Sequence, residues 1–144
     1  MKKAVLAAAM MATILLSATA LWAQSPVGKW KTVSDKTGKA ESVAQIYEQN
    51  GLIYGKLVEL LKPEDKGKVC SKCTGEDKDK PLLGLVFIKG LKADGDEYAG
   101  GTILAPGTGK IYKGKLKVTD GGKTLKVSGC ISFVCSGQTW LKAD

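Results

Sequence analysis

The sequence predicts an all-β fold: an antiparallel up-and-down meander of eight strands that closes into a barrel. Turn-forming Asn, Asp, Gly and Pro residues recur at short intervals, and the segments between them are rich in Val, Ile, Thr, Tyr and Leu. Two consecutive segments near the C-terminus alternate between lysine or small polar residues and apolar residues, the pattern of half-buried antiparallel strands. Closing such a meander removes its exposed edges, and eight strands make a barrel that is filled or holds one small ligand.

The N-terminal segment is predicted to be a secretory signal peptide covering residues 1–23. It starts Met-Lys-Lys and continues as an uncharged, mostly apolar run over residues 4–23, with small residues suited to cleavage after Ala20 or Ala23. The alternative is an uncleaved membrane anchor, because about 20 such residues just span a bilayer. Export implies a periplasmic or secreted protein whose residues 24–144 form a single β-barrel domain.

The composition excludes several classes of site. The 144 residues include no histidine and no arginine, so the chain by itself builds no Ser-His-Asp triad, no histidine-ligated zinc and no guanidinium clamp. Most of the acidic residues fall in expected turns, where solvation explains them without a catalytic role. We therefore expect no enzyme activity, no metal and no cofactor.

Each strand is bounded by a turn signal. The expected strands are residues 28–34, 40–48, 51–61, 82–91, 96–105, 110–119, 122–131 and 135–142. Residues 52–61 are apolar on both faces, so a helical end near 58–61 stays open as an alternative. The one long connection, residues 62–80, is charged and carries two cysteines, and its role as a lid or an insertion is open.

The alternation in the last part of the chain predicts which side chains face inward. The expected inward residues are Tyr112, Gly114, Leu116, Val118, Leu125, Val127, Gly129 and Ile131. The expected outward residues include Lys113, Lys115 and Lys117. A solvated lysine face of this kind also discourages edge-to-edge strand pairing.

Four cysteines form two close pairs in the sequence. Cys70 and Cys73 sit in the long connection, and Cys130 and Cys135 flank the last expected hairpin, where they face each other across the ladder. Three connectivities are formally possible, and an oxidising destination favours the two local disulfides. A redox-active Cys-x-x-Cys and a four-cysteine zinc site are the alternatives.

Several sequence features resemble one bacterial family. They are Val27-Gly28-Lys29-Trp30-Lys31-Thr32, Gln45-Ile46-Tyr47-Glu48, Tyr54-Gly55-Lys56-Leu57, Cys70-Ser71-Lys72-Cys73, Lys80-Pro81 with Gly84-Leu85, Gly100-Gly101-Thr102-Ile103-Leu104, Gly109-Lys110-Ile111-Tyr112 and Gln138-Thr139-Trp140. In this order they resemble the exported domain-of-unknown-function 2147 family over essentially the whole mature chain. The resemblance implies a small lipocalin-like barrel in the periplasm with no established activity.

The chain departs from the family pattern at three places. Ala105 stands where an acidic residue before the proline is expected, and Lys142 ends a segment that is usually polar and closes with arginine. The Cys130 and Cys135 pair resembles one branch of the family. These departures bear on any charge-based site near Ala105 or Lys142.

Gly28 and Trp30 form the Gly-x-Trp arrangement with which lipocalin-like barrels plug one end, the glycine making room for the indole. Simple core packing is the alternative role for Trp30. If a cavity remains above the plug, the remaining aromatic residues are candidates for its wall. These candidate ligand-binding residues are Tyr47, Tyr54, Phe87, Tyr98 and Tyr112.

Two functions follow as hypotheses. The first is an exported binding protein for a small apolar or amphipathic molecule. The second is a structural or interaction protein of the cell envelope, with a filled barrel and a lysine-rich surface that attracts an anionic component. The formal net charge of +8 is spread along the chain without arginine, so we expect no nucleic-acid binding, and membrane attachment only through an uncleaved signal.

Overall fold

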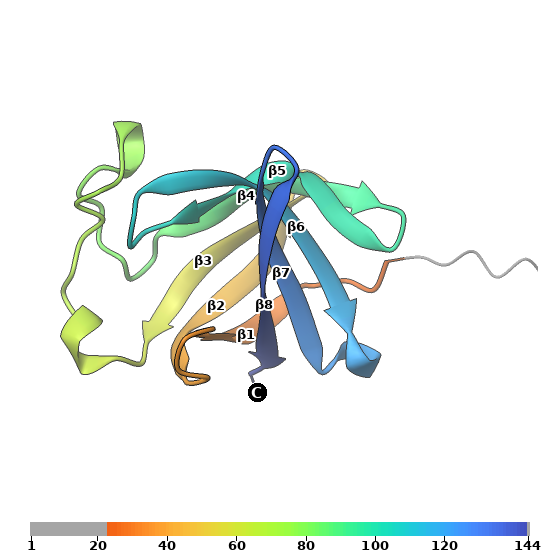
Figure 1. Cartoon of the computed structure of the whole chain (residues 1–144), viewed down its shortest axis with the longest axis horizontal. Helices are drawn as coiled ribbons and strands as arrows, with labels where there is room; N and C mark the ends of the chain where they lie inside the picture. Colours follow the sequence, from red (N-terminus) through yellow and green to blue (C-terminus); the bar gives the residue numbers. More distant parts are fainter. Residues whose placement is uncertain (1–22, 144) are drawn as a thin grey trace, which may run out of the picture.

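The computed structural model describes residues 23–143, so the expected signal peptide lies outside the described residues except for its last residue. Eight strands are hydrogen-bonded in sequence order, and the last pairs with the first, so the sheet is a closed antiparallel barrel (Figure 1). The strands are β1 (Gly28–Val33), β2 (Ala40–Gln49), β3 (Leu52–Leu60), β4 (Val86–Asp94), β5 (Glu97–Ala105), β6 (Lys110–Thr119), β7 (Thr124–Ile131) and β8 (Val134–Lys142). The predicted fold class is confirmed.

The meander gives the barrel two different ends. The β1–β2, β3–β4, β5–β6 and β7–β8 connections lie at one end, which we call the mouth end. The other three connections lie at the opposite end together with the start of β1 and the end of β8, and we call this the plugged end. Local turn chemistry fits each hairpin: Asn50 and Gly51, for example, both adopt the positive φ that the tight β2–β3 turn requires.

Large apolar side chains fill the interior, and inward-facing glycines make room for them. Ile46, Ile88, Leu91, Leu116 and Leu125 are fully buried in one core cluster. At Gly55 a Cβ atom would lie 2.9 Å from Ile46 Cδ1, and at Gly114 it would lie 2.7 Å from Ile103 Cγ1. These two glycines therefore face the core because a larger residue would displace isoleucine side chains already packed there.

The predicted alternation on β6 and β7 is confirmed, with one exception. Leu116 and Leu125 are buried, while Lys113 and Lys115 are exposed on the outer face. Two lysines of this face pair with carboxylates of the β4–β5 turn region: Lys117 Nζ lies 2.8 Å from an Asp96 oxygen, and Lys115 lies 3.7 Å from Glu97. Ile131 is the exception, because the strand continues beyond the barrel rim and leaves this side chain in solvent.

The fourth strand begins later than the sequence predicts. Residues 82–85 lie in the long connection rather than in a strand, and β3 is a strand throughout its length with no helical end. Gly84 adopts a positive φ of 86°, which interrupts an extended run, and Leu85 turns inward to become buried. The apolar run therefore packs as a loop, which the strand-like composition of these residues did not reveal.

The connection between β3 and β4 is tied down at several points (Figure 1, left). Cys70 and Cys73 form a disulfide and are both buried in the core cluster, and an isolated bridge joins Val69 to Pro81. Two short 3-10 turns, Pro63–Asp65 and Gly75–Asp77, give the rest of the segment regular local structure. These contacts describe a stapled insertion that is fixed to the barrel.

A buried carboxylate joins this connection to β4. Asp77 lies 2.9 Å from Lys89 Nζ and 3.5 Å from Lys80 Nζ. The hydrogen bond from Lys89 lowers the pKa of the Asp77 carboxyl below its ordinary value, against the opposing effect of burial. Asp77 is therefore ionised at neutral pH and holds the connection against the barrel wall.

The second disulfide joins Cys130 and Cys135, directly opposite each other on β7 and β8. Both local pairings expected from the sequence are thus confirmed, and no free cysteine is left among the described residues. Within residues 23–143 there is no helix long and apolar enough to cross a membrane, and no cluster of three or more potential metal-ligating carboxylates and cysteines.

Candidate functional site

The barrel holds a cavity of about 220 Å³ in its mouth-end half. Its wall is mainly apolar and comes from β4 to β8, with one residue of the β1–β2 turn at its edge. The lining residues are Asp35, Phe87, Ile103, Leu104, Ala105, Tyr112, Val127, Gly129, Ser136, Gln138 and Trp140. An apolar wall with a few polar groups is the ordinary character of a site for a small organic ligand.

Two aromatic side chains meet across the base of this cavity. Phe87 of β4 and Trp140 of β8 have ring centroids 6.0 Å apart in a tilted arrangement. The Trp140 indole N–H donates to Gln138 Oε1 at 3.1 Å, so both polar atoms point along the same inner face of β8. This bond leaves the Gln138 amide nitrogen as a donor beside an otherwise apolar surface.

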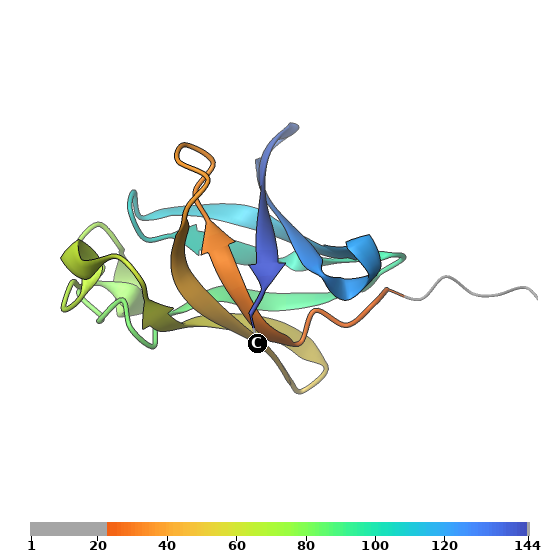
Figure 2. The ribbon, with the colours of Figure 1, turned by 90° about the horizontal axis from the view of Figure 1, so that it is seen from below.

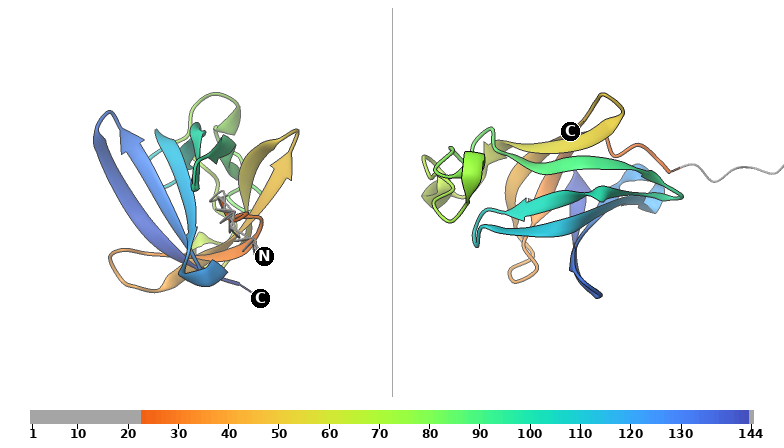
Figure 3. Two further views of the ribbon diagram at one scale, coloured as in Figure 1. Left: turned by 90° about the vertical axis from the view of Figure 1, so that its right-hand side faces the viewer. Right: turned by 90° about the horizontal axis from the view of Figure 1, so that it is seen from above.

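The cavity borders the place where β1 and β8 separate. Their ladder contains two residue pairs within the described residues, Trp30 with Lys142 and Lys31 with Leu141, whereas β7 and β8 pair along eight positions. Beyond these pairs the β1–β2 turn and the β7–β8 hairpin diverge (Figures 2 and 3). Asp35 and Ser136, from the two sides of this separation, both line the cavity.

The plugged end is closed around Trp30, as the Gly-x-Trp pattern predicts. The Trp30 side chain is 1% exposed, and its indole N–H donates to the carbonyl of buried Pro26 at 2.8 Å. Lys142 Nζ lies 4.5 Å from the centroid of the Trp30 ring, in the position of a cation–π contact. The ammonium of Lys142 thus covers the plug where the family resemblance leads one to expect an arginine.

The predicted role of Gly28 is wrong in one respect. A Cβ atom at this position would collide with the Nζ atom of Lys142, and the indole of Trp30 is not among its near neighbours. Gly28 also has a φ of 140°, which few L-residues adopt. Because the lysine end can move, the positive φ is the stronger reason for glycine at this position.

Two of the five predicted wall residues, Phe87 and Tyr112, line the cavity. Tyr98 is half-buried opposite Leu116, nearer the plugged end, and is not part of the cavity lining. Tyr47 and Tyr54 are paired neighbours on β2 and β3 whose rings stack with centroids 5.8 Å apart. They lie on the outer face, because the inward positions of these strands are occupied by Ile46, Ile53 and other buried residues.

Tyr47 and Tyr54 contribute instead to a groove of about 400 Å³ on the outside of the barrel. Its other side is formed by the long connection and the start of β4, including Asp77 and Lys89. Lys56 Nζ lies 5.4 Å from the Tyr47 ring centroid. The strands that carry Tyr47 and Tyr54 are apolar on both faces, so their alternation does not show which side chains face inward. The prediction that these two tyrosines line the interior is therefore wrong.

Several polar and small residues of the cavity were not among the predicted wall residues. Gln138 and Ser136 follow the same inward phase as Trp140, so extending the alternation from β7 into β8 would have found them. Gly129 was predicted to face inward but was not named as part of a cavity wall. Asp35 comes from a turn, and no periodicity could have placed it at the cavity edge. The arrangement as a whole supplies an apolar surface and two or three polar contacts, the chemistry of ligand binding.

Comparison with solved structures supports the architecture. The chain is similar to a structure whose title reads "Protein HP1028 from the human pathogen Helicobacter pylori belongs to the lipocalin family", with a TM-score of 0.72 and 20% identity. The match covers 83% of this chain and 84% of that chain. This similarity shows the lipocalin-like fold. No curated protein matches the sequence significantly.

A family model matches residues 28–142, the whole of the barrel from the first residue of β1 to the last residue of β8. Its description is "Uncharacterized protein conserved in bacteria (DUF2147)". The match includes the plug, the cavity and both disulfides described above. The chain therefore belongs to the bacterial DUF2147 family.

Proposed function

We propose that the protein is an exported, periplasmic binding protein that holds a small apolar or amphipathic molecule in the mouth-end cavity, and that it carries out no catalysis. The observation that carries the proposal is the cavity itself: an interior space of about 220 Å³ walled by Phe87, Tyr112 and Trp140. A barrel that served only as a rigid scaffold would gain stability by filling this space with side chains.

The cavity volume limits the ligand. About 220 Å³ is below the range of roughly 300–1,000 Å³ that is common for sites enclosing a drug-sized molecule. A single ring or a short acyl segment fits, and the remainder of a longer molecule would extend through the separation of β1 and β8. Gln138 and Ser136 lie where they would contact a polar group of such a molecule.

The location is supported by the two disulfides, which persist in oxidising compartments. Expression of the full-length gene in a bacterial host tests it. We expect the protein in the periplasmic fraction with an intact mass that corresponds to cleavage after Ala20 or Ala23. Recovery of the uncleaved chain from the cytoplasm would contradict the proposal.

Native mass spectrometry of the purified protein tests the ligand. We expect a bound species of low mass that is released by organic solvent and identified by denaturing mass spectrometry. The Ser136→Trp variant, which places an indole in the cavity, should abolish the bound species. Thr139→Trp is the matched control, because Thr139 is on the same strand but exposed on the outer face. Equal retention by both variants would place the ligand outside the cavity.

The second candidate is a structural or interaction protein of the envelope. Two observations favour it: the plugged-end half of the barrel is filled, and the outer face of β6 and β7 carries exposed lysines. Binding of an anionic polymer to this face should weaken steeply with added salt, whereas occupancy of the cavity should hardly change. A salt titration of both kinds of binding separates the two candidates.

A further inference from the structure

The β7–β8 hairpin carries an unusual apolar tip. Phe133 is 99% exposed, Val134 76% and Ile131 54%, and Ile111 on the neighbouring end of β6 is also exposed. These four residues, which we call the apolar tip, lie at one corner of the mouth end. Ile131, Phe133 and Val134 project together from the hairpin, and Ile111 is exposed on the outer face of the adjacent strand, so the group exceeds the scattered single residues found on ordinary protein surfaces.

The hairpin that presents the tip is held in shape by its own residues. Ile131 pairs with Val134 across the turn, and the Cys130–Cys135 disulfide joins the next pair below it. Ser132 takes a positive φ of 55°, so the turn is tight and places Phe133 at its apex. The hairpin projects beyond the rest of the barrel at the top of Figure 1.

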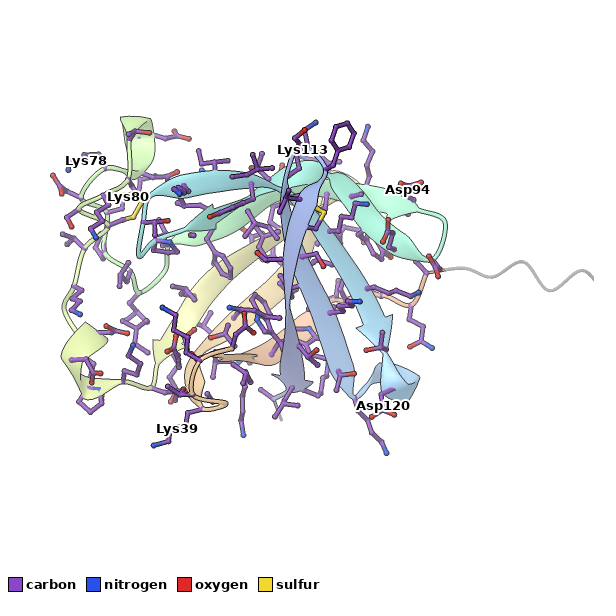
Figure 4. All side chains as sticks on the ribbon, viewed as in Figure 1. Lys39, Lys78, Lys80, Asp94, Lys113 and Asp120 are labelled. Carbon is purple, nitrogen blue, oxygen red and sulfur yellow. A yellow bond between two sulfur atoms is a disulfide. The ribbon has the colours of Figure 1, made fainter. Side chains whose placement is uncertain are left out.

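The chain segment that carries the tip is rich in lysine, and Asp35 of the β1–β2 turn is the one carboxylate that lines the cavity together with Ser136 of the hairpin. From Tyr98 to Ala143 the chain has seven lysines and one acidic residue, Asp120, which lies in the β6–β7 turn at the plugged end. Lys110 and Lys113 are the lysines nearest the tip in the strand register, and neither is in an ion pair among the described residues. Figure 4 shows Lys113 beside the hairpin, with Asp120 at the opposite end of β6.

The tip is continuous with the cavity. Along β7 and β8, Ile131 and Val134 occupy the same inward phase as Gly129 and Ser136, which line the cavity two pairs further down. An apolar molecule that left a bilayer beside the tip would therefore meet the cavity opening directly. A second copy of the chain or a protein groove would account for the apolar residues but not for the adjacent unpaired lysines.

We propose that the apolar tip docks the protein on a bilayer of anionic phospholipid, with Phe133 inserted below the headgroups and Lys110 and Lys113 at their level. Apolar insertion and electrostatic attraction are the two contributions by which proteins bind membrane surfaces without spanning them. Docking rests on the tip alone and does not require the proposed ligand, although it would place the cavity opening against the membrane.

Sedimentation with vesicles tests the proposal. The protein purified from the bacterial periplasm is mixed with vesicles of phosphatidylcholine alone or of phosphatidylcholine and phosphatidylglycerol in equal parts. We expect binding to the second kind and little to the first. Phe133→Ser should lower the partition coefficient by about tenfold, because it removes one large apolar side chain from the membrane. Its folding is checked by circular dichroism, and full exposure of Phe133 predicts no change.

The double variant Lys110→Gln and Lys113→Gln should lower the affinity for anionic vesicles by roughly fivefold for each lysine. The matched control is Lys123→Gln with Lys126→Gln, which removes the same charge from exposed positions of the β6–β7 turn and β7. This control should bind almost as the wild type does. Equal losses in the two double variants would show diffuse attraction and overturn docking through the tip.

Insertion itself is read from Phe133→Trp. Trp30 and Trp140 are buried, and cleavage after Ala20 would also retain Trp22, so the signal of the new tryptophan is read as the difference between the Phe133→Trp and wild-type spectra. We expect its emission to shift to the blue on anionic vesicles and to be quenched by brominated lipid. Absence of quenching, failure of the wild type to bind anionic vesicles, or a Phe133-dependent dimer with no vesicle binding would each refute the proposal. Loss of the bound ligand in Ser136→Trp with unchanged vesicle binding would leave docking intact.

Discussion

The two ends of this barrel are built from the same kind of hairpin but are packed in opposite ways. At the plugged end Trp30 is buried, hydrogen-bonded to Pro26 and covered by Lys142. At the mouth end the strands β1 and β8 separate, and Phe87 and Tyr112 face a space of about 220 Å³. The packed plugged end stabilises the barrel, and the mouth end retains an unfilled cavity.

The glycines mark the same difference. In the filled half, the inward-facing Gly55 leaves its side-chain space to Ile46 and Ile88. At the mouth, Gly129 gives its space to Tyr112, whose ring borders the cavity. The filled core and the open cavity thus lie at different ends of one short barrel, and substitutions at the two ends should have different consequences.

Replacing the plug should have the largest effect. Trp30→Ala removes a buried indole and leaves the Pro26 carbonyl without its donor, so we expect a loss of about 3–5 kcal/mol in the free energy of unfolding. Tyr112→Ala, beside an existing cavity, should cost about 1–2 kcal/mol. Urea denaturation followed by circular dichroism measures both. If Trp30→Ala does not fold, Trp30→Phe retains part of the packing, and an effect smaller than that of Tyr112→Ala would contradict the comparison.

After the plug, the connection between β3 and β4 at the mouth end should be the part whose substitution most lowers the free energy of unfolding. A Cβ atom at Gly109 would collide with the carbonyl oxygen of Lys72, and Gly109 has a φ of 74°. Gly109→Ala should therefore destabilise the protein by about 1–3 kcal/mol and loosen the connection around Cys70 and Cys73. Hydrogen exchange of the amides in residues 69–85 reports the loosening. Gly107→Ala is the control, since nothing lies near its Cβ position, and similar exchange in both variants would argue against this contact.

Acid should release the same connection before it affects the plug. Because Lys89 lowers the pKa of the Asp77 carboxyl, ionised Asp77 stabilises the folded state above its unfolded-state pKa of about 3.9. This contribution is lost as the pH falls through the lower folded-state value. Asp77→Asn should cost about 1 kcal/mol at neutral pH and flatten the acid limb of the stability curve. An unchanged acid limb would mean that the ion pairs with Lys80 and Lys89 do not stabilise the fold.

We expect the smallest loss in the free energy of unfolding at Lys142, whose ammonium lies over the Trp30 ring. Lys142→Gln removes the ammonium above the Trp30 ring and should cost about 0.5–1 kcal/mol. Lys126→Gln, on the outer face of β7, should change the free energy of unfolding by less than about 0.5 kcal/mol. Thermal unfolding of the two variants under identical conditions compares them. Equal midpoints would show that the contact with Trp30 contributes nothing to closing this end.

The order and approximate bounds of the strands could be read from the sequence, because each turn signal acts within a few residues. Lysine alternation fixed the orientation of β6 and β7 for the same reason. The start of β4 could not be predicted in this way, since Leu85 leaves the extended run to pack into the core. The aromatic residues of the cavity were only partly predictable: Tyr112 lies in a strand with clear alternation, whereas Tyr47 and Tyr54 lie in strands apolar on both faces.

Taken by itself, the sequence determined the barrel class, the two local disulfides and the tryptophan at one end, because these depend on turn residues, strand periodicity and cysteine spacing. Only the tertiary structure decided which aromatic residues face the interior, how Lys142 reaches Trp30 and where β1 parts from β8. These features depend on contacts between residues far apart in the chain, such as Phe87 with Trp140. Closure of the barrel brings such residues together, and no local pattern records that geometry.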